Sequence, residues 1–154
     1  MKIKLFALII LLINLGCDKK NNETCSTGNN LLPIALRYLD YAEYVELASN
    51  IAKANDSRLL YQYMNICLDV DGEHAQNFTN GLVLILRKSP AKTFNQAFLK
   101  LPNSKQQEII NSICEEYGLS NFYEQGKRKL EKDKHINEFI YIKCLKESEK
   151  FNNN

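Results

Sequence analysis

The fold class of this chain is decided by residues 90–118, which read PAKTFNQAFLKLPNSKQQEIINSICEEYG. Pro90 suits the first turn of a helix, and apolar residues follow at the helical positions i, i+3, i+4 and i+7: Phe94, Ala97, Phe98 and Leu101. Pro102 ends this helix, Asn103 or Ser104 can cap the next one, and Gly118 terminates it. The apolar stripe of the second helix consists of Ile109, Ile110, Ile113, Cys114 and Tyr117. The stretch therefore predicts two consecutive helices joined at a proline.

Helical patterns continue on the N-terminal side of this pair. Residues 29–56 form one long helix or two, broken near Tyr41, and residues 56–72 form another that Asp56 or Ser57 can cap. The run GLVLIL at 81–86 is compatible with a buried strand. Its helix-forming flanks and the lack of a partner strand in the sequence favour a nearly fully buried helix instead.

The C-terminal part of the chain predicts two more helices. Residues 120–135 are the most charged segment, with Phe122 and Leu130 as its apolar contacts. Residues 134–151 bury four positions, Ile136, Phe139, Ile140 and Cys144. The fold class that follows is all-α, with six or seven short helices packed as antiparallel hairpins in an irregular helical bundle or a short α-solenoid. The helix, proline turn and helix of residues 90–117 resemble one unit of HEAT-type α-solenoid proteins, although the chain has no clean internal repeat.

The N-terminus has a different character from the rest of the chain. It reads MKIKLFALIILLINLGC, with two lysines, a short apolar run and a small residue before Cys17, which is the order of a secretory signal peptide. Leu15-Gly16-Cys17 resembles the lipobox of bacterial lipoproteins, although Asn14 stands where that family prefers leucine. The resemblance implies cleavage before Cys17 and a lipid on its sulfur. It places the protein in the bacterial cell envelope, anchored to the inner or the outer membrane, with its domain facing the periplasm.

These observations divide the chain into four parts. Residues 1–16 are the expected signal peptide, 17–30 a polar flexible tether, 31–151 a single helical domain, and 152–154 a disordered tail. The chain has 20 Lys+Arg and 18 Asp+Glu, and the signal peptide carries Lys2 and Lys4. Its removal therefore leaves equal numbers of basic and acidic residues, which argues against a nucleic-acid partner.

Four cysteines remain once Cys17 is assigned to lipidation: Cys25, Cys67, Cys114 and Cys144. In an oxidising envelope an even set of cysteines indicates disulfides, and we expect at least one. The pairing that we favour is Cys114–Cys144, because these residues lie on neighbouring predicted helices. The alternative is that Cys67 and Cys114 are small apolar core residues.

Residues that could carry catalysis or bind a metal form no recognisable pattern. The stretch DVDGEH at 69–74 fails the spacing of an EF-hand loop, because Gly72 falls at the wrong position. His74 and His135 belong to no metal-binding or catalytic motif, and neither a nucleophile elbow nor a glycine-rich phosphate loop occurs. The sequence therefore predicts a protein that is not an enzyme and has no cofactor or metal.

Two sets of residues could form a binding surface. Tyr38, Tyr41, Tyr44 and Tyr61 are candidate partner-binding residues, because tyrosine is common at protein interfaces and equally common at the rim of helical cores. A basic cluster is formed by Lys127, Arg128, Lys129, Lys132 and Lys134, which face solvent or an acidic partner.

The functional prediction is a non-catalytic protein-binding module. It is tethered to the membrane through the lipid on Cys17 and acts as an adaptor or assembly factor for another envelope protein. The alternative is an immunity protein that neutralises a secreted cell-wall-degrading toxin.

Overall fold

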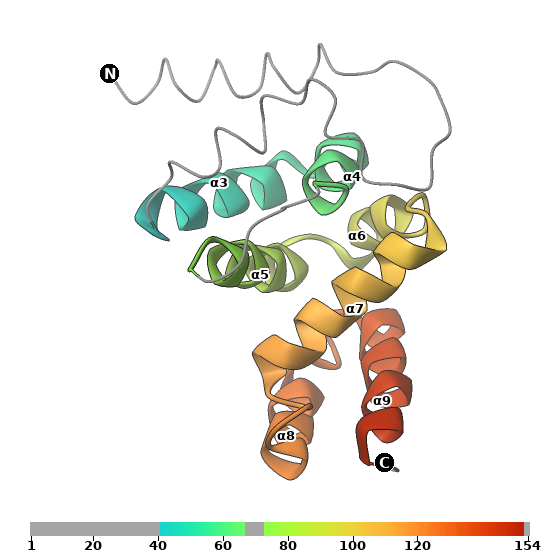
Figure 1. Ribbon diagram of the computed structural model, residues 1–154. Helices are drawn as coiled ribbons and strands as arrows, with labels where there is room; N and C mark the ends of the chain where they lie inside the picture. The colour runs from blue at the N-terminus through green and yellow to red at the C-terminus, as the bar shows by residue number, and fades with distance from the viewer. Residues whose placement is uncertain (1–40, 67–72, 153–154) are drawn as a thin grey trace.

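The computed structural model describes residues 41–66 and 73–152, and in these two ranges it contains seven helices and no strand (Figure 1). In chain order the helices are α3 (Tyr41–Ala54), α4 (Ser57–Met64), α5 (Glu73–Lys88), α6 (Ala91–Phe98), α7 (Asn103–Tyr117), α8 (Tyr123–Asp133) and α9 (Glu138–Asn152). The all-α prediction is confirmed. The GLVLIL run lies within α5, as the helical interpretation required.

The helices form two groups that α7 connects. Figure 1 shows α3, α4, α5 and α6 at one end of the molecule, α8 and α9 at the other, and α7 running obliquely between them. The most extensive contacts join α3 to α5, α4 to α6 and α7 to α9. Each of these pairs skips one helix of the chain. The consecutive helices α6 and α7, which resemble a HEAT unit in sequence, therefore make their main contacts with α4 and α9, respectively.

One apolar core extends through both groups. Leu82 and Ile85 of α5 are completely buried, as are Ile109 and Ile113 of α7. Burial of one such side chain contributes about 1.5–3 kcal/mol, so these positions are among the strongest stabilising contacts of the fold. The apolar run at 81–86 is buried on most sides of α5, and only Leu84 is half-buried, which explains why the run lacks a clear amphipathic period.

The predicted helix ends are correct in two cases and wrong in one. Oδ1 of Asp56 accepts a hydrogen bond of 2.8 Å from the backbone N–H of Arg58 and so caps α4. Gly118 ends α7 in the left-handed conformation with φ of 77°, which a side chain rarely adopts. Neither Asn103 nor Ser104 caps α7, because the helix follows Pro102 directly and no side chain accepts a cap hydrogen bond. Proline holds the helix start through its fixed φ instead.

Three apolar positions that we predicted to be buried lie nearer the surface. Phe139 of α9 is half-buried and packs against the core. Phe122 is 65% exposed, because it immediately precedes α8 and the buried side of that helix passes through Gly126 and Leu130. Ile136 is half-buried, because it lies in the turn before α9 and not inside that helix. The last helix also continues through Asn152, the first residue of the expected tail.

A buried lysine ties α7 to the segment after α4. Lys105 is only 6% exposed, and its Nζ donates hydrogen bonds to the carbonyl oxygen of Ile66 at 2.8 Å and to Oε1 of Glu108 at 2.5 Å. A buried ammonium group is costly unless it is paired, and both contacts reduce that cost. Lys105 therefore belongs to the structural core and not to a binding surface.

A glycine allows α8 to cross closely over the end of α7. A Cβ atom placed on Gly126 would lie 2.8 Å from the carbonyl oxygen of Tyr117 and 2.9 Å from the backbone nitrogen of Leu119. These neighbours are backbone atoms and cannot rotate away. The position of α8 against α7 therefore requires glycine at residue 126, because any Cβ atom there would clash.

We predict that Gly126→Ala lowers the free energy of unfolding by about 1–2 kcal/mol, because the steric cost exceeds the gain of about 1 kcal/mol in helix propensity. Urea unfolding followed by circular dichroism measures this change. The matched control is Gln125→Ala, an exposed position of the same helix, which should alter stability by less than about 0.5 kcal/mol. A Gly126→Ala midpoint equal to or above that of the parent protein would contradict the close crossing.

Candidate functional site

Of the four tyrosines predicted to bind a partner, the structure describes three, and these differ in exposure. Tyr41 is 55% exposed, Tyr61 is half-buried against the core, and Tyr38 lies outside the described residues. Tyr44 is 1% exposed, so the prediction for this residue is wrong. It lies on the face of α3 that also buries Leu47 and Ala48, because the drifting tyrosine spacing crosses the leucine stripe at this point. Burial raises the pKa of the Tyr44 hydroxyl and keeps it neutral.

The cysteine predictions divide between described and undescribed residues. Leu15, Gly16, Cys17, Cys25 and Cys67 lie outside the described residues. Cys114 and Cys144 are buried on the contacting helices α7 and α9, as their neighbouring positions suggested. Both are free thiols, so the disulfide that we favoured between them is not formed in this structure.

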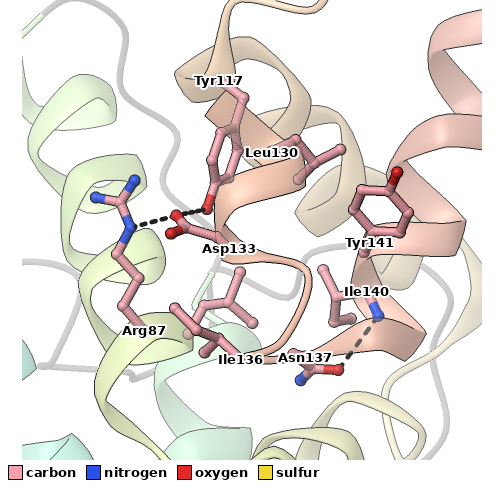
Figure 2. A pocket seen from close by; sticks show the side chains of 9 residues that line it. Arg87, Tyr117, Leu130, Asp133, Ile136, Asn137, Ile140 and Tyr141 are labelled. Atoms are coloured by element: carbon pink, nitrogen blue, oxygen red, sulfur yellow. Dashed lines mark hydrogen bonds and ion pairs between the residues drawn. The ribbon is translucent and has the colours of Figure 1, made fainter. Parts of the chain in front are cut away.

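A polar cluster joins α5, α7 and α8. Oδ2 of Asp133 accepts a hydrogen bond of 2.8 Å from Nε of Arg87 and one of 2.5 Å from the hydroxyl of Tyr117 (Figure 2). The guanidinium carbon of Arg87 also lies 5.5 Å from the centre of the Tyr117 ring, within the range of a cation–π contact. These three residues come from three different helices, and Arg87 is 46 positions from Asp133, so they act as a clasp between the two groups of helices.

The pKa of Asp133 reflects this cluster. Partial burial alone would raise the pKa of the carboxyl, but hydrogen bonds from Tyr117 and Arg87 outweigh burial and hold the pKa below its usual value. Burial and the hydrogen bond to Asp133 raise the pKa of the Tyr117 hydroxyl, so Tyr117 stays a neutral donor. Each of the three side chains thus has a hydrogen-bond partner inside the clasp, which makes the clasp a structural link between the helices.

The hollow beside the clasp is small. It holds about 240 Å³ of empty space that includes open solvent, and it is lined mainly by apolar side chains such as Leu86, Leu130 and Ile140 (Figure 2). Sites for small molecules enclose roughly 300–1,000 Å³ and bury most of the ligand. We therefore assign the clasp and its hollow to stability and look for the functional surface elsewhere.

The outer side of α8 carries three of the five basic residues that the sequence singled out. Lys127 is half-buried and lies over the ring of Tyr123, and Lys134 follows the helix and pairs with Glu138. Gly126 and Leu130 mark the buried side of the helix, and the opposite side presents Gln125, Arg128, Lys129 and Lys132, all of which are exposed. We call these four residues together with Phe122 the basic face. Nε of Arg128 donates to the backbone carbonyl of Glu124 at 3.2 Å. Within the described ranges, none of the three basic side chains forms an ion pair.

Phe122 adds an apolar element to the basic face. Its side chain is 65% exposed, the highest value among the large apolar residues that the structure describes as exposed. Phe122 lies directly before the first residue of α8, so it stands at the N-terminal end of the helix that carries the three basic side chains. Water surrounds this ring in the isolated chain, and an apolar pocket on a partner would remove that unfavourable exposure.

Four further findings complete the description of the described residues. Among residues 41–66 and 73–152, no group of three or more His, Cys, Asp or Glu side chains is arranged to hold a metal ion. No helix in the same ranges combines the length and the apolar composition needed to cross a bilayer. His135 is exposed, and the side chain of His74 lies outside the described part of the chain. No protein-family model, curated protein or solved structure matches this chain.

We predict that Asp133→Asn lowers the free energy of unfolding at pH 7 by about 1 kcal/mol, a value discounted because Arg87 is 48% exposed. The folded-state pKa of Asp133 is depressed, so the carboxylate stabilises the fold above its unfolded pKa of about 3.9. That contribution is lost as the pH falls through the lower folded pKa.

Urea unfolding at a series of pH values tests this prediction. The difference between Asp133→Asn and the parent protein should disappear below about pH 3. The matched control is Glu131→Gln on the exposed side of α8. Its free energy of unfolding should equal that of the parent protein at every pH of the series. A constant difference from pH 7 to acid would assign the effect of Asp133→Asn to packing and not to charge.

Proposed function

We propose that this protein is a lipid-anchored protein of the bacterial cell envelope that binds another envelope protein without catalysing a reaction. The basic face of α8 is its binding surface, and the partner offers an acidic patch with an apolar pocket. The single observation that carries the proposal is the exposed ring of Phe122 at the start of a helix whose exposed side chains Arg128, Lys129 and Lys132 have no ion-pair partner among the described residues.

The chemistry of this face fits protein recognition. Aromatic and arginine side chains dominate the energetically important positions of protein interfaces, where an apolar anchor fills a pocket and charges surround it. Phe122 supplies the anchor and Arg128 a planar group that binds carboxylates in a bidentate manner. The lysines attract an acidic partner over a distance of about one Debye length, roughly 8 Å at physiological salt.

The charge of the whole chain favours a protein partner over a nucleic acid. The residues after the predicted signal peptide contain equal numbers of basic and acidic side chains, so the basic face is a local feature on a balanced molecule. Binding to nucleic acid depends on neutralising many phosphates and requires a larger excess of positive charge.

The lipid on Cys17 defines where the interaction takes place. Two or three acyl chains bind a membrane durably, whereas one chain binds reversibly, so lipidation frees the helical domain from any membrane-binding role. The domain then faces the periplasm on a polar tether and captures its partner near the membrane surface. Confinement of this kind raises the effective concentration of the partner without adding contacts.

A photo-crosslinking amino acid at position 122 tests the proposed surface in intact membranes. We expect one crosslinked protein at this position, attached through an acidic segment that mass spectrometry of the crosslinked peptide identifies. The matched control places the same amino acid at Leu99, which is also strongly exposed at 58% and lies at the end of α6. Equal crosslinking from both positions would contradict a specific interface on α8.

We predict that the triple substitution R128E/K129E/K132E slows association with the crosslinked partner at least about tenfold and abolishes the dependence of the rate on salt. Circular dichroism should show an intact fold, because all three side chains are exposed. Surface plasmon resonance with the purified partner measures the rates.

A Cys17→Ala variant separates the role of the lipid anchor from the role of the basic face. The binding face should keep its affinity in this variant, whereas recruitment of the partner to membranes should be lost. An unchanged association rate of the triple variant would contradict binding through the basic face. Unchanged recruitment of the partner to membranes by the Cys17→Ala variant would contradict a role that depends on the lipid anchor. A partner that is held with slow dissociation whether or not the lipid is present would match an inhibitor such as an immunity protein.

A further inference from the structure

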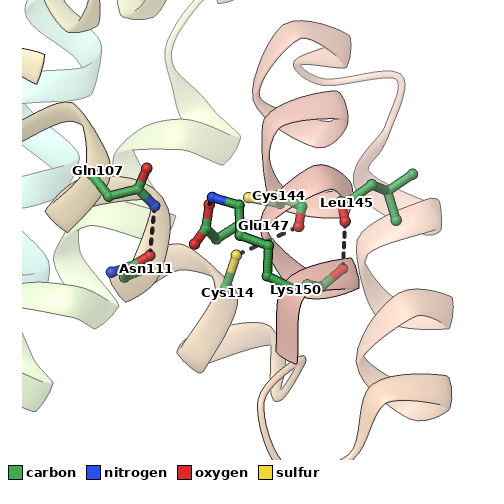
Figure 3. Close-up of polar contacts among 8 residues, drawn as sticks. Gln107, Asn111, Cys114, Cys144, Leu145, Glu147 and Lys150 are labelled. Atoms are coloured by element: carbon green, nitrogen blue, oxygen red, sulfur yellow. Dashed lines mark hydrogen bonds and ion pairs between the residues drawn. The ribbon is translucent and has the colours of Figure 1, made fainter. Parts of the chain in front are cut away.

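Two cysteine side chains meet in the buried contact between α7 and α9. Cys114 is 1% exposed and Cys144 is fully buried. The Sγ atom of Cys114 donates a weak hydrogen bond of 3.8 Å to the carbonyl oxygen of Cys144, and Figure 3 shows both thiols in the space between the two helices. The two residues are 30 positions apart, so this contact joins the C-terminal helix to the central helix of the fold.

The contact brings the thiol of Cys114 against the backbone of Cys144 across the interface between α7 and α9. A disulfide joins two cysteines whose Cβ atoms lie roughly 3.5–4.5 Å apart, so a pair that already meets in this way is suited to form one. No other cysteine of the described ranges is available to either thiol, since these two are the free cysteines there.

We propose that Cys114 and Cys144 form a disulfide that cross-links α7 to α9, and that this bond closes while the chain folds and not after folding. The structure contains the reduced form of the pair, and the disulfide is the form that an oxidising environment produces. This inference does not rest on the proposed binding function, because the pair is buried between α7 and α9 and contributes nothing to the basic face of α8.

The timing follows from the chemistry of the buried thiols. A thiol reacts with a disulfide only as the thiolate. Hydrogen bonding with Cys114 and burial raise the pKa of Cys144 well above its ordinary value, and the negative charge of Glu147 acts in the same direction. Glu147 is held in place by an ion pair of 2.7 Å with Lys150 (Figure 3). Burial therefore shields both thiols from an oxidant, and the Cys144 thiol is also poorly ionised.

The oxidation is a thiol–disulfide exchange with a protein or small-molecule disulfide as the oxidant. The thiolate of one cysteine attacks a sulfur of the oxidant, forms a mixed disulfide and releases one thiolate. The second cysteine, deprotonated, attacks the mixed disulfide, forms the intramolecular S–S bond and releases the second thiolate. The chain loses two protons and two electrons. The disulfide of the oxidant accepts them and is released as two thiols.

The experiment compares two routes to oxidation of the full-length chain in detergent. One sample is reduced in urea and then refolded in a buffer of oxidised and reduced glutathione. The second sample is reduced, refolded, and only then placed in the same glutathione buffer. After quenching with acid, peptide mass spectrometry without reduction identifies the linked cysteines.

We expect the first sample to contain a crosslink between the peptides of Cys114 and Cys144 and the second to contain both thiols free. Alkylation of these thiols in the folded reduced protein should be at least about 100-fold slower than in urea. The oxidised protein should unfold at a temperature roughly 5–15 °C higher than the reduced protein. These measurements need no substitution in the core.

Two results would overturn the proposal. Links from Cys114 or Cys144 to Cys25 or Cys67, or persistence of both thiols after refolding, would show that the pair does not bond. Equal crosslinking in both samples would show that the folded pair is accessible and would remove the claim about timing. A C25A/C67A variant provides the control, because it removes the competing cysteines and should form the same crosslink to the same extent.

Discussion

The structure depends on the burial of α7 from more than one side. This helix packs against α5, α8 and α9 and is the element that connects the two groups of helices. Ile109 and Ile113 are completely buried, and Tyr117 is 2% exposed at its C-terminal end. The exposed side of α7 carries residues such as Gln107, Glu108 and Glu115, and its remaining sides cover apolar surface of both groups. The loss of packing on α7 would therefore separate the molecule into two parts that are each too small to bury a stable core.

The sequence predicts the helices well and their pairing poorly, for a physical reason. Helices are local, so apolar spacing around Phe94 and Ile109, an αL glycine at residue 118 and a capping aspartate at residue 56 are sufficient to locate them. Pairing is a global choice among apolar faces of similar size, and no local pattern distinguishes α4 from α7 as the neighbour of α6. The misplaced burial of Phe122 has the same origin, because residue 122 precedes the first turn of α8 and the helical period does not extend to it.

The candidate site could be predicted in part. The basic cluster and the pair Cys114 and Cys144 are visible in the sequence, because charge and cysteine are rare enough to be noticed in any context. The clasp of Arg87, Tyr117 and Asp133 carries no such signal: its members are ordinary residues on three helices, and only the crossing of those helices brings them together. Tyr44, by contrast, was singled out as a surface residue and is buried. Tyrosine suits both a surface and a core, and its position relative to Leu47 decides between them only once the packed face is known.

The clasp and the close crossing at Gly126 bear directly on the basic face, because they hold α8 at both ends. Gly126 fixes the first turns against the end of α7, and Asp133 fixes the last turn through Arg87 and Tyr117. One side of α8 is therefore immobilised, and the opposite side presents Arg128 and Lys132 in a constant orientation. A rigid surface gives up less conformational freedom on binding than a mobile one. The residues that stabilise the fold would thus also lower the entropic cost of the interaction that we propose for α8, although none of them belongs to the basic face.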